Sequence, residues 1–187
     1  MTPETTTFVL HVDDEPGVLN RIASVVRRRG FNIHSVSVGR SDVPAVSRMT
    51  LVIDAADPAA ARLEAHLSKL VQVRRVEDVT HVTSVSRDLG MIKVSADTAS
   101  RAAIMQLVDV FRARVIDVAP DSLVVEITGT EDKVDGFLEI LRPYGVLEVA
   151  RTGRVTMARG ATPRAAAKRG SRRAEEETHG GQVACSV

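Results

Sequence analysis

The chain has 187 residues, of which 44% are apolar and 3% aromatic, and its formal net charge is +1. That length accommodates one ordinary domain or two small ones, with a core built from aliphatic side chains. The charge is uneven, because the segment from Arg159 onward holds six basic and three acidic residues. The preceding body is therefore slightly acidic, which argues against binding to nucleic acid.

The sequence offers no sign of export or of membrane insertion. The first residues contain neither the basic nor the apolar region of a secretory signal, and no run reaches about 18 apolar residues. Cys185 is the only cysteine, so no internal disulfide can form. These features predict a cytoplasmic protein with no membrane partner.

The first half of the chain alternates strand-like and helix-like patterns in the order βαββαβ. The expected strands are 7–12, 31–38, 48–54 and 71–78. One helix is expected to begin near Val18 and to end at Gly30, which suits the left-handed residue after a helix. A second helix is expected with Asp57 as its N-cap residue and Pro58 as its first helical residue.

One irregularity is expected within the second strand. The apolar side chains change parity between Ile33 and Val36, so that the alternation cannot continue with a period of two. A change of parity within a strand predicts a β-bulge or a bend at that point.

The same order of elements runs again after a polar connector at 79–88. The expected elements are a strand at 89–96, a helix at 104–111, a hairpin of 114–119 and 122–128, a helix capped by Thr130, and a strand at 145–151. This order predicts an α+β fold of two ferredoxin-like βαββαβ domains.

The expected division follows from these patterns and from the polar segments between them. It places a disordered N-terminus at 1–6, a first domain at 7–79, a linker at 80–87, a second domain at 88–158 and a disordered C-terminal tail at 159–187. The tail lacks apolar periodicity, which is typical of disordered segments.

The most informative stretch lies between the first strand and the first helix. Pro16 and Gly17 form a turn that opens the helix, whose first N–H groups can hold a carboxylate. Asp14 stands beside this turn and can accept hydrogen bonds from an ammonium group. Together these groups would recognise a free amino acid. The alternative is a plain strand–helix turn in which the acid serves only as a helix cap.

The chemistry of an independent enzyme is missing from the sequence. No glycine-rich phosphate loop, HExxH segment, cysteine pair or GxSxG elbow occurs. The acidic pairs Asp13/Asp14 and Glu131/Asp132 lie at turns and helix starts, where acids serve as caps. An RNA-recognition sheet would need surface aromatics that this chain lacks. We therefore expect a binding protein that has no catalytic residues.

Several segments, taken together, resemble the small, regulatory subunit of acetolactate synthase. In the first domain these are Val12–Leu19, Arg28–Val38, Ser47–Leu51 and Lys69–Val73, which resemble its amino-terminal ACT domain. In the second domain they are Ser86–Val94, Phe111–Val118 and Glu148–Gly153. The resemblance covers roughly residues 7 to 160.

The resemblance implies a site for an amino-acid effector, which is valine in most members of the family. It implies a homodimer formed through the ACT domains, with the effector bound at their interface. The residues that match the effector site are Asp14, Gly17, Val18 and Leu19 from one chain and Asn32 and Ile33 from the other. Position 14 is Asp where some members have Asn, so the affinity or its pH dependence is expected to differ.

The resemblance also implies a partner and a role. The partner is the large, catalytic subunit, which uses thiamine diphosphate, Mg²⁺ and FAD in the first common step of branched-chain amino-acid synthesis. This chain is expected to bind none of those cofactors, to activate the partner and to confer feedback inhibition. The alternatives are a stand-alone tandem ACT sensor that acts on transcription or another enzyme, and an enzyme with an unrecognised site.

Overall fold

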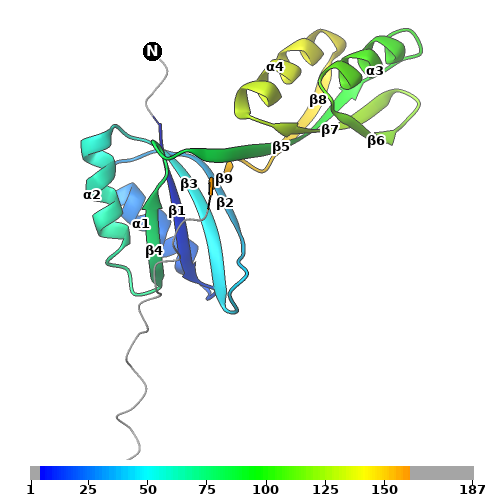
Figure 1. Ribbon diagram of the computed structural model, residues 1–187. Helices are drawn as coiled ribbons and strands as arrows, with labels where there is room; N and C mark the ends of the chain where they lie inside the picture. The colour runs from blue at the N-terminus through cyan, green and yellow to red at the C-terminus, as the bar shows by residue number, and fades with distance from the viewer. Residues whose placement is uncertain (1–4, 161–187) are drawn as a thin grey trace, which may run out of the picture.

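The computed structural model describes residues 5–160, and the predicted α+β fold with two ferredoxin-like units is confirmed (Figure 1). Most of the two segments predicted to be disordered, 1–6 and 159–187, lies outside the described residues. The prediction is wrong for Thr5 and Thr6, because both belong to the first strand. Thr6 is buried there and its hydroxyl donates to the carbonyl of Ala55.

The first domain follows the predicted order. Its elements are β1 (Thr5–Asp13), α1 (Val18–Arg28), β2 (Ile33–Arg40), β3 (Val46–Asp54), α2 (Asp57–Leu67) and β4 (Val73–Asp78). The strands form an antiparallel sheet in the order β2-β3-β1-β4, which leaves β2 at one edge. The core lies between this sheet and the two helices, where Phe8, Ile22 and Leu63 are almost fully buried.

Local details of the first domain follow the predictions with one exception. Gly30 has a φ of 77° directly after α1, and the register of β2 shifts between Ile33 and Ser35, as the parity change predicts. Asp57 is not the N-cap residue of α2. Ala56 takes that extended conformation, and the helix begins at Asp57. Pro58 is tolerated one position later because the N–H groups of the first helical turn have no acceptor within the helix.

The second domain contains more strand than the sequence predicts. Its elements are β5 (Ser84–Ser95), α3 (Arg101–Val110), β6 (Arg114–Val118), β7 (Ser122–Gly129), α4 (Glu131–Leu141), the 3₁₀ turn η1 (Arg142–Tyr144), β8 (Val146–Arg151) and β9 (Val155–Ala158). The sheet order is β6-β7-β5-β8, the hairpin of β6 and β7 is confirmed, and Thr130 is the N-cap residue of α4. A separate core surrounds Ile92, Ile104 and Phe137.

Strand β5 takes part in three ladders. Its first part, from Ser84 to Arg87, pairs with β9, whereas its second part pairs with β7 and β8. The polar connector predicted at 79–88, which includes the predicted linker at 80–87, is therefore part of a β-strand from Ser84 onward, which the sequence analysis does not predict. The backbone groups of this polar segment find their partners in β9, a strand of four residues that the sequence analysis does not predict.

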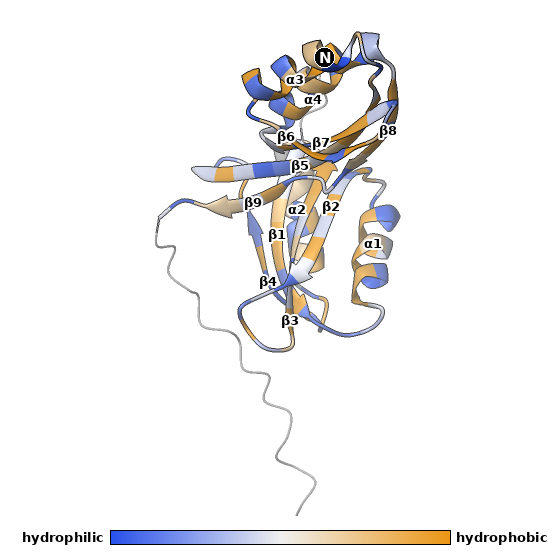
Figure 2. Cartoon of the chain, turned by 90° about the vertical axis from the view of Figure 1, so that its right-hand side faces the viewer, coloured by the Kyte–Doolittle hydropathy of each residue, from blue (hydrophilic) through white to orange (hydrophobic). Residues whose placement is uncertain are grey.

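The ribbon of β5 and β9 lies against the face of the first sheet that α1 and α2 leave open (Figure 1). Arg48 on β3 donates to the backbone carbonyl of Thr156, and Arg154 donates to Thr7 of β1. The first part of β5 is mostly hydrophilic, whereas β9 and β1 are mostly hydrophobic (Figure 2). Among residues 5–160, no helix has both the length and the apolar composition needed to cross a bilayer.

Candidate functional site

The turn before α1 presents an open helix N-terminus. Gly17 has φ 85° and ψ −7°, a left-handed conformation that residues with a Cβ rarely adopt. A Cβ built at Gly17 would meet no atom within 4 Å, so the space in front of the turn is free in this chain. No side chain caps α1. The interpretation of the acidic residues here as helix caps is therefore wrong, and the first N–H groups of α1 remain available.

Asp14 is held beside this turn by residues from two other strands. Its Oδ1 accepts a hydrogen bond of 3.1 Å from the hydroxyl of Ser47, and Arg40 Nε lies 3.6 Å from Oδ2. Its backbone N–H donates to the carbonyl of Ala45. The Asp14 side chain is still 43% exposed, so it can accept further hydrogen bonds. Sequence analysis missed Ser47 and Arg40 as partners because the turn and these strands meet only in the folded sheet.

The two apolar residues of the predicted site differ in accessibility. Val18 is 5% exposed and belongs to the core of the first domain, whereas Leu19 is 50% exposed. Only Leu19 of this pair can offer its side chain to a ligand. The contribution of Val18 to a site is therefore limited to its backbone.

Asn32 and Ile33 lie at the opposite end of the same sheet. Asn32 Nδ2 donates to Asp54 at 2.9 Å, and the Asn32 carbonyl accepts from the backbone N–H of Asp54. Asp54 pairs with Thr5, while Asp13 stands eight residues further along β1, a separation of about 26 Å at strand rise. One chain therefore does not bring Asp14 and Asn32 together.

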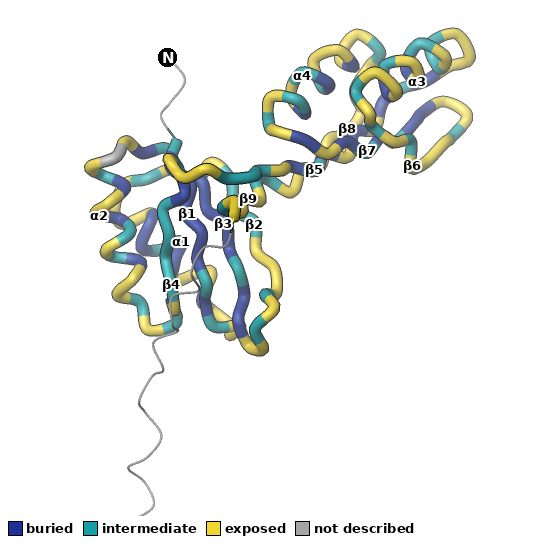
Figure 3. The backbone as a smooth tube through the Cα atoms, viewed as in Figure 1, coloured by how far each residue is buried: buried dark blue, intermediate teal, exposed yellow. Residues whose placement is uncertain are grey.

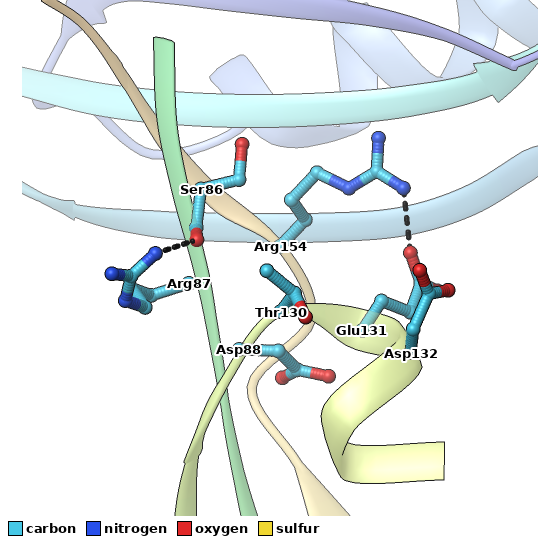
Figure 4. A pocket seen from close by; sticks show the side chains of 7 residues that line it. All are labelled: Ser86, Arg87, Asp88, Thr130, Glu131, Asp132 and Arg154. Atoms are coloured by element: carbon cyan, nitrogen blue, oxygen red, sulfur yellow. Dashed lines mark hydrogen bonds and ion pairs between the residues drawn. The ribbon is translucent and has the colours of Figure 1, made fainter. Parts of the chain in front are cut away.

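A second group of polar residues joins the two domains. His34 Nε2 on β2 lies 3.1 Å from Oε1 of Glu131, which is in the first turn of α4. Arg154, from the segment between β8 and β9, approaches the other oxygen of Glu131 at 2.5 Å and donates to Thr7 at 3.1 Å. Figure 4 shows Arg154 and Glu131 facing each other beside Asp88.

Asp88 anchors the second domain at this junction. It is 4% exposed and accepts from Arg151 at 2.5 Å, while Arg151 also contacts Asp135 on α4. A cavity of about 330 Å³ separates these residues from β2 and is lined by His34, Ser35, Val36, Asp88, Glu131, Arg151, Thr152 and Gly153. A neighbouring cavity of about 180 Å³ is lined by Ser86, Arg87, Asp88, Thr130, Glu131, Asp132 and Arg154. Neither cavity is lined by any of the six predicted site residues.

The carboxyl group of Glu131 makes the stability of the junction depend on pH. The hydrogen bond from Arg154 lowers the pKa of Glu131, burial opposes this, and the hydrogen bond from His34 lowers it further. A group whose pKa is lower in the folded state stabilises the fold above its unfolded pKa, and this is lost as the pH falls through the folded value.

We expect Glu131→Gln to cost about 1 kcal/mol or less at neutral pH and to remove part of the acid sensitivity below about pH 4.3. The measurement is the urea midpoint of the chain and of the variant between pH 6 and pH 3. Asp132→Asn is the control, because Asp132 makes no ion pair with any residue in 5–160. An unchanged acid profile in Glu131→Gln would contradict the assignment.

Comparison with known proteins agrees with this fold. Residues 8–75 match the family described as AHAS small subunit-like ACT domain, so the first domain is an ACT domain. Residues 87–160 match the family described as small subunit of acetolactate synthase. The chain belongs to the acetolactate synthase small-subunit family.

Individual relatives cover nearly the whole of the described chain. The acetolactate synthase small subunit of Mycobacterium bovis is 44% identical over 160 residues, which cover 86% of this chain and 95% of that protein. A probable acetolactate synthase small subunit from Methanothermobacter thermautotrophicus is 43% identical over 161 residues, covering 86% and 96%. The crystal structure of the small subunit from Thermotoga maritima has a TM-score of 0.79 at 35% identity and covers 85% and 99%.

Proposed function

We propose that this chain is the regulatory, non-catalytic subunit of acetolactate synthase. In this role it activates the catalytic subunit and makes it sensitive to a branched-chain amino acid, with valine as the first candidate. Membership of the small-subunit family supports the regulatory role. The observation that carries the effector site is the uncapped N-terminus of α1 behind Gly17, with Asp14 beside it.

The groups at this turn match the two charges of an amino acid. The N-terminus of a helix carries a partial positive charge and free N–H donors, which favour the carboxylate. The exposed carboxylate of Asp14 accepts hydrogen bonds from the ammonium group. Leu19 provides apolar surface for an aliphatic side chain. A pocket of this kind distinguishes valine from leucine by only about 1–3 kcal/mol per methylene.

A dimer formed through β2 would complete the site. β2 is an edge strand, and Val36 and Val38 on it are 38% and 47% exposed. Figure 3 shows exposed and half-buried stretches along this strand. If two copies pair their β2 strands antiparallel about a two-fold axis, the start of one strand lies beside the end of the other. Asn32 and Ile33 of one chain would then approach the Asp14 turn of its partner.

We expect Val36→Lys to shift the protein from dimer to monomer, because it places a charge on the proposed apolar edge. The fold should change in stability by about 0.5 kcal/mol or less, as for other exposed positions. Analytical ultracentrifugation of the full chain measures the effect. Val71→Lys is the control, since Val71 is 89% exposed and lies away from β2. A Val36→Lys protein that remains dimeric would contradict pairing through this edge.

The deciding experiment is an assay of acetolactate formation by the catalytic subunit with its thiamine diphosphate, Mg²⁺ and FAD. The rate is measured with and without this chain, and then with millimolar valine. Stimulation that valine reverses supports the whole proposal. Stimulation without an effect of valine retains the partner and rejects valine as the effector. No stimulation would reject the partner and favour a stand-alone tandem ACT sensor.

A further inference from the structure

We propose that His34 is a positioning residue that transmits amino-acid binding at Asn32 to the second domain. It does so by donating its ring N–H either to Glu131 or to Asp54. This inference rests on the proposed function, because it assumes that Asn32 is an effector-binding residue, and it assigns the contact through which that site communicates.

The β-bulge in β2 gives His34 its unusual position. Ile33 pairs with Ile53 and Ser35 pairs with Val52, so His34 is the extra residue that faces no partner in the ladder. A bulge turns one side chain out of the regular alternation, and bulges are frequent beside functional sites. His34 is thereby directed at the second domain, while its chain neighbours Asn32 and Ile33 stay in the proposed effector site.

Two carboxylates compete for this ring. Glu131 Oε1 lies 3.1 Å from Nε2, and Asp54 Oδ1 lies 3.9 Å from Nδ1. A neutral imidazole has one N–H, so it can donate to one carboxylate at a time. In this structure the short contact is to Glu131, and it is a hydrogen bond when the ring carries its proton on Nε2. The Asp54 Oδ1 atom is buried and has no hydrogen-bond partner among the described residues.

The Asn32 side chain determines whether Asp54 has a hydrogen-bond donor other than His34. Asn32 Nδ2 donates a hydrogen bond of 2.9 Å to Asp54 Oδ2. Among the described residues, no other side chain donates a hydrogen bond to Asp54. If an effector takes that amide group, Asp54 loses its side-chain donor on Oδ2, while its buried Oδ1 already lacks a hydrogen-bond partner, which is costly. The nearest replacement is Nδ1–H of His34. A shift of about 1 Å would bring it within hydrogen-bond distance.

A change in the hydrogen bond of His34 would alter the contacts between β2 and the second domain. When His34 donates to Asp54, Glu131 keeps Arg154 but loses its direct contact with β2. The cavity of about 330 Å³ between β2 and the second domain gives the ring and the start of α4 room to move. The two alternative hydrogen bonds of His34 therefore define two positions of α4 relative to the ACT domain, as a coupling mechanism requires.

The test measures the position of the domains in the full chain without any amino acid. Spin labels are placed by Ala61→Cys on α2 and Gln106→Cys on α3 in a Cys185→Ser background, and pulsed EPR gives the populations of interdomain distances. We expect His34→Ala to change the ratio of populations by about fivefold, as the loss of one net hydrogen bond predicts. His34→Gln keeps a donor at the same place and should restore the original ratio, and Asp132→Asn should leave it unchanged.

The same measurement tests the coupling role of His34 separately from the assignment of Asn32 to the effector site. Asn32→Ala should shift the ratio in the otherwise unmodified chain and should add nothing in the His34→Ala chain. Millimolar valine should act in the same way, with its binding followed by calorimetry. An unshifted ratio in His34→Ala, or an equal response to Asn32→Ala with and without His34, overturns the proposal. Absence of valine binding rejects the effector assignment alone, because the Asn32 arm needs no ligand.

Discussion

Replacing Gly17 by aspartate is expected to weaken valine binding by more than about a hundredfold while the chain remains folded. The new Cβ meets no atom within 4 Å, so the substitution creates no clash within the chain. The added carboxylate would occupy the space in front of α1 that we assign to the carboxylate of the effector. Calorimetric titration of the full chain with valine measures the loss.

A control is needed for the backbone strain of an aspartate in the left-handed conformation of Gly17. Gly145 has a φ of 90°, and a Cβ there would make only an ordinary contact of 3.6 Å with Ser95. Gly145→Asp should therefore carry a similar backbone cost in the second domain and leave valine affinity within about twofold of the original. Valine affinity that survives in Gly17→Asp, with the fold intact by circular dichroism, would place the effector elsewhere.

The second large effect is expected from truncating the core of the second domain. Phe137 is fully buried and its ring lies 5.0 Å from that of Phe111. Phe137→Ala should lower the free energy of unfolding of this domain by about 3–5 kcal/mol, through lost burial and the cavity left behind. Hydrogen exchange in increasing urea reports each domain separately, and protection should fall in α3, α4 and β7.

Phe8→Ala is the matched variant in the first domain. Phe8 is equally buried, but it belongs to the other core. We expect it to reduce protection in β1, β3 and α1, whereas Phe137→Ala should leave those elements and the binding of valine nearly unchanged. If Phe137→Ala reduces protection equally in both domains, the two cores unfold as one unit, and the expectation of separate unfolding is wrong.

Much of the fold is predictable because its signals are local. The βαββαβ order, the left-handed Gly30 and the bulge near His34 each depend on patterns within a few residues. The exact start of α2 at Asp57 and the strand character of Ser84 to Arg87 were missed. The second of these depends on pairing with β9, more than sixty residues away in the sequence, and short polar strands carry little periodicity of their own.

The candidate site also contains a part that the sequence predicts and a part that only the fold reveals. The turn at Asp14 and Gly17 is visible in the sequence because the residues are contiguous. The junction is not, since His34 and Glu131 are separated by 97 residues. Histidine, glutamate and arginine at such distances occur in any chain of this length, and only the fold places them in contact. The six effector residues remain a prediction, because one chain holds them at two ends of a sheet.

The pairing of β5 with β9 at one end and with β7 and β8 at the other bears on how the second domain can move. Its twelve residues run without interruption from the pairing with β9 to the pairing with β7 and β8. A paired strand resists bending within the plane of its sheet but changes its twist at little cost. We therefore expect any relative motion of the two domains to be torsional, with β5 as the axis, so that a small rotation near His34 would displace α3 by a larger distance.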